Sequence, residues 1–157
     1  MTTGKIALLA ALLGISVIAF AADDPMDGDW KLNLAKSKIG MSSKPKSLIN
    51  GYHTDASGNV KVTTDNVSAD GKKTHREYTE RYDGKEYNAD SQGGDTVSLK
   101  RIDSHTVEGA YKRDGKVRAT FRRTVSKDGK TLTTESQGES PTVKGQQYHD
   151  IRVFDKI

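Results

Sequence analysis

The fold class of this chain is decided by two short stretches, Met26-Asp27-Gly28-Asp29-Trp30-Lys31-Leu32 near its start and Arg152-Val153-Phe154-Asp155-Lys156 at its end. The residues between them form short alternating segments separated by Asp-Gly turns. Alternation of apolar and polar residues with a period of two is typical of β-strands that bury one face. The chain is therefore predicted to form a small β-barrel that closes its last strand onto its first.

The first residues have the features of a secretory signal peptide. Lys5 precedes an apolar run over residues 6–20, and Ala19-Phe20-Ala21 forms a small-x-small cleavage site. A membrane anchor is the weaker interpretation, because the run is shorter than the roughly 20 residues that a span needs. We predict a signal peptide over residues 1–21, a single domain over residues 22–157, and export to the periplasm or the exterior.

Composition excludes several classes of function. The formal net charge is +4 and the basic residues are interspersed with acidic ones, so no basic stripe of the kind that binds nucleic acid is present. The chain has no cysteine, which removes disulfides, thiol nucleophiles and thiolate metal ligands. Leu, Ile, Val and Phe form about 15% of residues 22–157, below the ~20% under which disorder is an alternative when the net charge is also high. Because the net charge is low and the strand pattern is strong, we predict a folded domain. A core this thin fits a barrel with a partly polar interior.

Asp-Gly turns divide the chain into strands. Asp-Gly between alternating segments is among the strongest hairpin signals, because tight hairpins need positive φ angles. The motif Asp-Gly-Lys occurs at residues 70–72, 83–85, 114–116 and 128–130. We prefer plain hairpins to calcium loops, since no D-x-D-x-D-G loop with a distal Glu is present. Strands are predicted at residues 28–34, 47–54, 59–66, 72–82, 85–90, 95–102, 105–113, 116–126, 130–137 and 145–155, with a loop over residues 35–46 and no helix after the signal peptide.

Alternation predicts which side chains face the barrel interior. The inward sets include Trp30-Leu32-Leu34, Val60-Val62, Val97-Leu99, Val107-Tyr111 and Val117-Ala119-Phe121-Val125. Arg123 shares the face of Phe121, and Arg76, Tyr78, Glu80 and Tyr82 share another. A buried arginine needs a partner. For Arg123 that partner is a carboxylate such as Glu80, ordered water or an anionic ligand, unless the face is misassigned.

The two end stretches also carry a resemblance. Gly28-Asp29-Trp30 has the G-x-W form of the first strand of calycin barrels, the superfamily of lipocalins, fatty-acid-binding proteins and avidins. The stretch through Leu32 resembles the opening of a fatty-acid-binding protein, and residues 152–156 are similar to that family's last strand. The resemblance implies an all-β fold, an antiparallel up-and-down meander closing into a calycin-like, lipocalin-like barrel of about ten strands.

The resemblance also implies a ligand site. In fatty-acid-binding proteins, late-strand arginines and an aromatic residue of the last strand hold the ligand carboxylate. By motif these are Arg152, Phe154 and either Arg122 or Arg123, of which we prefer Arg123 because it shares a face with Phe121. Tyr111 is added as an inward-facing aromatic.

Trp30 is assigned to closing the barrel. A lipocalin-like alternative places Arg152 across the Trp30 ring as a structural cation. Which face of the last strand points inward stays open, because Ile151 and Val153 compete with Tyr148, Arg152 and Phe154.

Three features depart from the fatty-acid-binding pattern. Phe154 replaces a tyrosine, the segment after the first strand is too short and polar for a helical lid, and the signal peptide indicates export. The architecture also resembles that of small secreted bacterial domains with a lipocalin-like barrel.

No catalytic motif is present, and no cofactor or metal is indicated. The sequence lacks a P-loop, G-x-S-x-G and H-E-x-x-H, and none of its four histidines is paired at metal-ligand spacing. One interpretation of the last strand makes His149 an axial haem ligand. We prefer the interpretation in which His149 is a surface or hydrogen-bonded histidine.

The preferred function is therefore an exported binding protein, not an enzyme, for a small apolar or amphiphilic ligand, including anionic ones. It would have no nucleic-acid partner and no stable membrane insertion. The alternative is a structural or interaction domain of the cell envelope with a filled barrel.

Overall fold

The structure is a computed structural model that describes residues 24–40, 44–89, 94–140 and 145–157. The predicted signal peptide over residues 1–21 lies outside the described residues. The described part of the chain forms a single antiparallel sheet with the strands β1 (Gly28–Leu32), β2 (Ser47–Thr54), β3 (Val60–Val67), β4 (Lys73–Glu80), β5 (Asp83–Asn88), β6 (Asp95–Asp103), β7 (Thr106–Arg113), β8 (Lys116–Val125), β9 (Thr131–Glu139) and β10 (Gln147–Lys156). The predicted all-β meander is confirmed.

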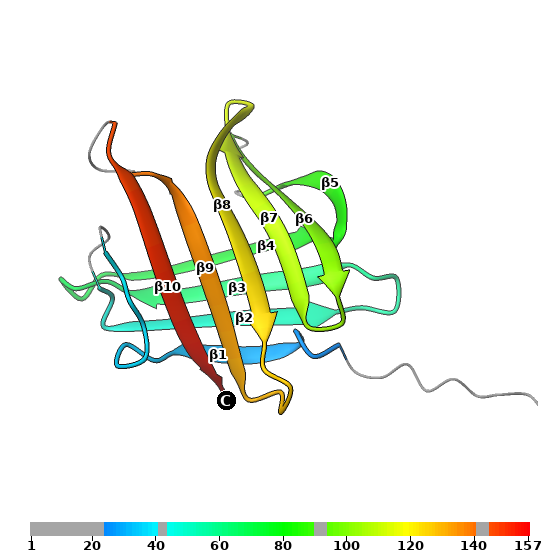
Figure 1. The fold of residues 1–157 in the computed structure, drawn as a ribbon, viewed down its shortest axis with the longest axis horizontal. Helices are drawn as coiled ribbons and strands as arrows, with labels where there is room; N and C mark the ends of the chain where they lie inside the picture. Colours follow the sequence, from blue (N-terminus) through cyan, green and yellow to red (C-terminus); the bar gives the residue numbers. More distant parts are fainter. Residues whose placement is uncertain (1–23, 41–43, 90–93, 141–144) are drawn as a thin grey trace, which may run out of the picture.

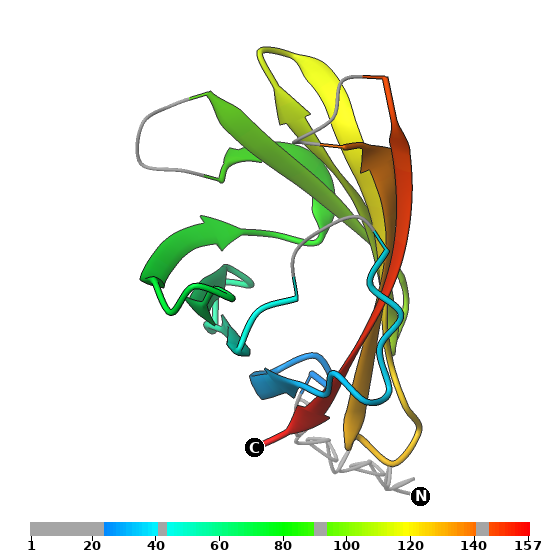
Figure 2. The ribbon, with the colours of Figure 1, turned by 90° about the vertical axis from the view of Figure 1, so that its left-hand side faces the viewer.

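The sheet curls into a barrel because the last strand pairs with the first. Its strand order is β4-β3-β2-β1-β10-β9-β8-β7-β6-β5, and Trp30 of β1 lies opposite Lys156 of β10. The strands β7–β10 run steeply across β2–β4 (Figure 1), and Figure 2 shows the two halves meeting at β1 and β10. The strands β4 and β5 are the two edges of the sheet, so within the described residues the barrel is open between them.

The loop predicted after β1 continues the pairing along β10. The strand β1 ends at Leu32, and residues 33–40 then follow the edge of β10. The backbone N–H of Asn33 donates to the Val153 carbonyl at 2.8 Å, and Lys38 and Ile151 exchange backbone hydrogen bonds of 2.7 and 2.8 Å. These bonds satisfy the edge groups of β10 that the short β1 strand leaves unpaired.

Three of the four Asp-Gly-Lys motifs close hairpins, and one does not. At Asp114-Gly115 both residues have positive φ, 51° and 72°, as a two-residue type I′ turn requires. The motifs at residues 70–72 and 128–130 close the β3–β4 and β8–β9 hairpins. The motif at residues 83–85 lies instead within β5, which pairs with β6, and the Tyr82 carbonyl accepts a hydrogen bond from the Arg101 N–H at 3.2 Å. At this point the chain therefore pairs with β6 instead of β4, and a gap remains between β4 and β5.

The apolar core occupies the end of the barrel near the β6–β7 and β8–β9 turns. Trp30, Phe154, Val107 and Leu132 are fully buried there. Most predicted inward positions are buried as expected, including Val60, Val62, Val97, Leu99, Phe121 and Val125.

Two predicted core residues are exposed. Leu34 is exposed because β1 ends two residues earlier, at Leu32. Val117 is exposed because a register shift between Tyr111 and Lys112 of β7 interrupts the alternation on β8.

Candidate functional site

A cavity of about 320 Å³ lies inside the barrel beyond the apolar core. It is lined from one side by Leu48, Asn50, Tyr52, Val62, Thr64, Arg76 and Tyr78 of β2–β4, and from the other by Tyr111, Ala119, Phe121, Arg123, Thr134, Ser136, Tyr148, Asp150, Arg152 and Phe154 of β7–β10. All four residues predicted to bind a ligand, Arg152, Phe154, Arg123 and Tyr111, line this one space. Trp30 lies in the core and does not line it.

The sequence of β8 and β9 explains why the barrel is packed at one end and hollow further along. Inward positions of β9 run from Leu132 in the core to Thr134 and Ser136 in the cavity, and the inward position of β8 nearest the open end is Ala119. Since alternate residues point to the same face, these short side chains occupy successive inward places. They are too small to reach the opposite wall, and the space remains.

The last strand turns its polar face inward. Asp150 and Phe154 are buried and Arg152 lines the cavity, while His149 is exposed on the outer face. Arg152 Nη2 lies 3.2 Å from Asp150 Oδ2, whose side chain is 1% exposed. The carboxylate and the guanidinium lie two residues apart, on the same side of β10.

The cation over Trp30 is a lysine, and the alternative role of Arg152 is therefore wrong. Lys156 Nζ lies 5.1 Å from the centre of the Trp30 ring. Trp30 Nε1 donates to the Met26 carbonyl at 3.0 Å. Arg152 belongs to the cavity because its place on β10 puts it on the inward face, whereas Lys156 pairs directly with Trp30 across the β1–β10 ladder.

Arg123 forms a buried ion pair with Glu80. Its Nη1 lies 3.0 Å from Glu80 Oε1, and the two side chains are 4% and 0% exposed. The guanidinium also stacks between the rings of Tyr52 and Phe121, at 4.7 and 4.8 Å. Glu80 is thus the partner of Arg123, as one of the alternatives predicted from the sequence had it. Burial raises the pKa of Glu80, while the adjacent Arg123 charge opposes that shift.

Tyrosines form much of the remaining wall. The Tyr78 and Tyr111 hydroxyls lie 3.3 Å apart, and the Tyr111 ring lies 4.9 Å from the Phe121 ring. Burial raises the pKa of Tyr52 to about 12 and raises that of Tyr78 as well. These phenols therefore stay neutral over the physiological pH range and can donate or accept hydrogen bonds.

Sequence reasoning missed Asp150, Tyr52 and Asn50 as site residues. The signal for Asp150 was its position between Tyr148 and Arg152 at alternate residues of β10, which places the three side chains on one face. Tyr52 and Asn50 follow Leu48 at alternate positions of β2, which is the same signal. It could not be used without knowing which face of each strand points inward.

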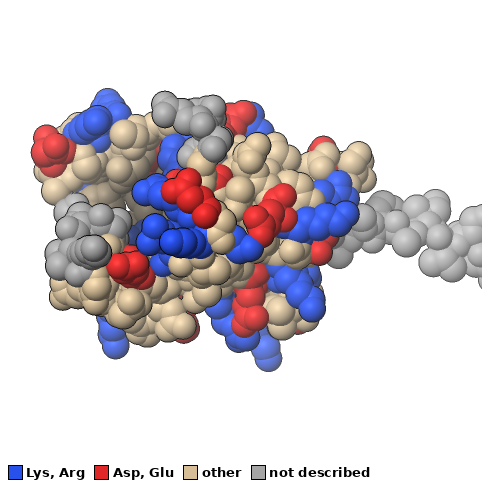
Figure 3. Space-filling view, turned by 90° about the horizontal axis from the view of Figure 1, so that it is seen from above, with Lys and Arg blue, Asp and Glu red and all other residues tan. Residues whose placement is uncertain are grey.

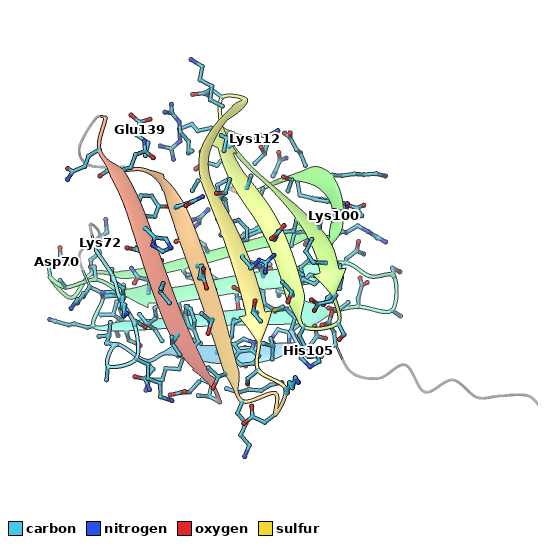
Figure 4. The ribbon with its side chains drawn as sticks, in the orientation of Figure 1. Asp70, Lys72, Lys100, His105, Lys112 and Glu139 are labelled. Carbon is cyan, nitrogen blue, oxygen red and sulfur yellow. The ribbon has the colours of Figure 1, made fainter. Side chains whose placement is uncertain are left out.

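The cavity continues into a wider, charged mouth at the end of the barrel away from the core. This hollow, about 570 Å³, shares Arg76, Tyr111, Ala119 and Tyr148 with the inner cavity. Figure 4 shows Lys112 and Glu139 at this end and His105 at the opposite one. Figure 3 looks onto the mouth and shows a hollow with Lys and Arg side chains beside it. The charged residues that line the mouth are Arg76, Asp95, Lys112, Arg113, Arg118 and Glu139.

The site contains no arrangement for metal chemistry in the part of the chain that the structure covers. Among those residues, no group of three or more His, Asp or Glu side chains could hold a metal ion. In the same residues, no helix is long and apolar enough to cross a membrane.

Comparison with known proteins identifies the fold. No protein-family model matches the sequence, and no curated protein matches it significantly. Among solved structures, the fluorescent protein UnaG is similar, with a TM-score of 0.55 and 14% identity, covering 83% of this chain and 96% of that one. A point mutant of UnaG gives a TM-score of 0.56 at 13% identity, covering 85% and 96%. The fold is that of a calycin-type β-barrel.

Proposed function

We propose that this protein binds a small apolar or amphiphilic molecule inside its barrel. The observation that carries the proposal is the internal cavity of about 320 Å³, which falls at the lower end of the ~300–1,000 Å³ range of small-molecule sites. Its walls combine aromatic rings with a few charged and hydroxyl groups. Such walls provide affinity by burying apolar surface, and their polar groups orient the ligand.

The four residues named from the sequence take different parts in this proposal. Phe154 and Tyr111 supply apolar and aromatic surface at the floor and wall of the cavity. Arg123, stacked between two rings and paired with Glu80, is a rigid part of the floor. Arg152, which is partly exposed and lines the cavity beside Asp150, is the arginine placed to offer a hydrogen bond to a ligand deep in the barrel.

The alternative is a structural or interaction domain with a filled barrel. Trp30, Phe121 and Phe154 do fill part of the interior. The short side chains of Ala119, Thr134 and Ser136 do not fill the rest, and this observation favours binding over a purely structural role.

The proposal includes export. The leader over residues 1–21 is expected to be removed after Ala21, so that the working protein begins at Ala22 in the periplasm or outside the cell. Expression of the full chain in a bacterium, followed by intact-mass measurement of each cell fraction, tests this. A protein that keeps its first 21 residues in the cytoplasm would contradict export and leave the binding proposal standing.

Binding is tested by native mass spectrometry of the processed protein taken from its exported fraction. We expect a bound small molecule that is released on denaturation. Ala119→Trp fills the cavity from β8 and should abolish that mass. The matched control is Ala110→Trp on the neighbouring strand β7, where Ala110 lies in a groove of the outer face. A ligand retained by Ala119→Trp would place binding outside this cavity and contradict the proposal. No small molecule bound by either the wild type or the control would favour the filled-barrel alternative.

A further inference from the structure

The positive charge of the cavity is unevenly compensated. Deep in the barrel, each arginine has a carboxylate: Arg123 pairs with Glu80 at 3.0 Å and Arg152 with Asp150 at 3.2 Å. The inner part of the site is therefore close to electrically neutral. An anionic group placed there would meet two buried carboxylates as well as the two guanidinium groups.

Arg76 is the exception among the arginines that line the cavity. It lies on β4 at the open edge of the sheet, opposite Thr64 of β3, and it lines both the inner cavity and the mouth. Its Nη2 donates to the Ala89 carbonyl at 2.6 Å. Within the described residues it forms no ion pair, and the side chain is exposed. The guanidinium of Arg76 is therefore positioned by an uncharged carbonyl group, which does not neutralise it.

The other cations of the mouth have carboxylate partners. Arg113 holds Asp95 through two hydrogen bonds of 2.7 and 2.8 Å, Lys112 pairs with Glu86, and Arg118 Nη1 lies 3.3 Å from Glu139. Arg113 lowers the pKa of Asp95 through these bonds, and Arg76 lowers it further from a distance. One carboxylate thus serves two arginines, and among the residues that the structure describes Arg76 is the cation of the site without a carboxylate at ion-pair distance.

We infer that the ligand is an amphiphile with a terminal anionic group, bound with that group outward on Arg76 at the mouth and its apolar body inward. This inference rests on the proposed binding function and adds the class of ligand and its direction. A carboxylate, sulfate or phosphate at the mouth gains a charge-assisted hydrogen bond and keeps part of its hydration. The same group moved inward would lose its water next to Glu80 and Asp150, which is unfavourable. The apolar body contacts the rings of Tyr78, Tyr111 and Phe121.

The test uses two fluorescent probes that differ in one group. Both 8-anilino-1-naphthalenesulfonate and N-phenyl-1-naphthylamine carry the same aromatic body, and only the first has a sulfonate. Dissociation constants are measured for the processed wild-type protein and for Arg76→Gln, Arg76→Lys, Arg152→Gln and Arg122→Gln. Arg122 is the matched control, because it lies on the outer face of β8 paired with Glu108. Ala119→Trp verifies that both probes enter the cavity.

We expect Arg76→Gln to weaken the sulfonate probe by about fivefold to tenfold and to change the neutral probe by less than about twofold. Arg76→Lys should restore most of the loss, and Arg122→Gln should have no effect on either probe. A selective loss of the sulfonate probe in Arg152→Gln, with Arg76→Gln unchanged, would overturn the outward orientation while supporting the binding function. Equal losses of both probes in Arg76→Gln would also overturn it. Binding of neither probe to the wild type would refute the proposed function and the inference with it.

Discussion

Removing one partner of the Arg123–Glu80 pair should destabilise the protein far more than removing both. In Glu80→Leu the Arg123 guanidinium remains buried at 4% exposure with no carboxylate, and in Arg123→Met the carboxylate remains at 0% exposure. An uncompensated buried charge costs about 3–5 kcal/mol of folding free energy. For a domain of this size that corresponds to a fall in Tm of about 10–17 °C.

The double variant Glu80→Leu/Arg123→Met removes both charges and keeps similar volumes. Met can still pack between the rings of Tyr52 and Phe121, which lie at 4.7 and 4.8 Å from the guanidinium. We expect it to lie within about 2 kcal/mol of the wild type, because replacing a whole buried pair by apolar residues is often neutral or stabilising.

Urea unfolding followed by the fluorescence of the single tryptophan, Trp30, measures all four proteins. The matched control is the cycle Glu108→Leu and Arg122→Met on the outer face. Those side chains are 45% and 52% exposed, so each change should cost less than about 1 kcal/mol.

The Arg123→Met variant carries a second signature, in its pH dependence. Burial raises the pKa of Glu80, and without Arg123 only the hydrogen bond with Tyr78 opposes that shift. A carboxyl group with a raised pKa in the folded state stabilises the fold when protonated. The contribution is present below the unfolded pKa and is lost as pH rises through the folded value. This variant should therefore lose stability, relative to the wild type, on going from pH 4 to pH 8. Single variants that lose less than about 1 kcal/mol, or a double variant that loses their sum, would refute the reasoning.

Three further predictions concern the walls and the frame of the barrel. Tyr52, with a pKa of about 12 in the folded protein, should stay un-ionised at pH 11. Because this pKa is raised, the contribution of Tyr52 to stability is lost as the pH rises from its unfolded value near 10 to 12. Absorbance at 295 nm during alkaline titration should therefore show a delayed phase that coincides with unfolding. Phe154→Ala should cost about 3–5 kcal/mol in urea unfolding, because Phe154 is buried at the junction of core and cavity; a loss below 1 kcal/mol would contradict its placement. Gly109→Ala should cost about 1–3 kcal/mol, because an added Cβ would lie 2.5 Å from the Ser98 carbonyl oxygen, and an unchanged Tm would contradict the close approach of β6 and β7.

The strand pattern was predictable because it depends on local chemistry. Three Asp-Gly-Lys motifs became hairpins since two neighbouring residues suffice to make a tight turn. The motif at residues 83–85 did not, although its local chemistry is the same. There β5 pairs with β6 and not with β4, and this choice involves a strand that the local sequence around the turn does not specify. That choice opens the gap beside Arg76.

The candidate site was predictable only in part, because it depends on contacts between strands that lie far apart in the sequence. Alternation placed Arg123 with Phe121 and Glu80 with Tyr82, and the barrel then brought two strands far apart in sequence close enough to pair the charges. On the last strand alternation allowed two faces, and apolar content did not choose between them. The pairing of Phe154 with Leu32 and the loop over residues 33–40 orient β10, and this orientation brings Asp150 and Arg152 into the cavity.

The sequence by itself determined the two-residue period of the strands and three of the four Asp-Gly-Lys hairpins, because each of these depends on interactions between neighbours along the chain. Only the tertiary structure decided which arginines are neutralised. The partner of Arg123 is Glu80, which lies across the barrel, and the partner of Arg152 is Asp150, two residues away on the same strand. Arg76 donates instead to a backbone carbonyl. Charge compensation depends on distance and burial in three dimensions, and no linear pattern records either.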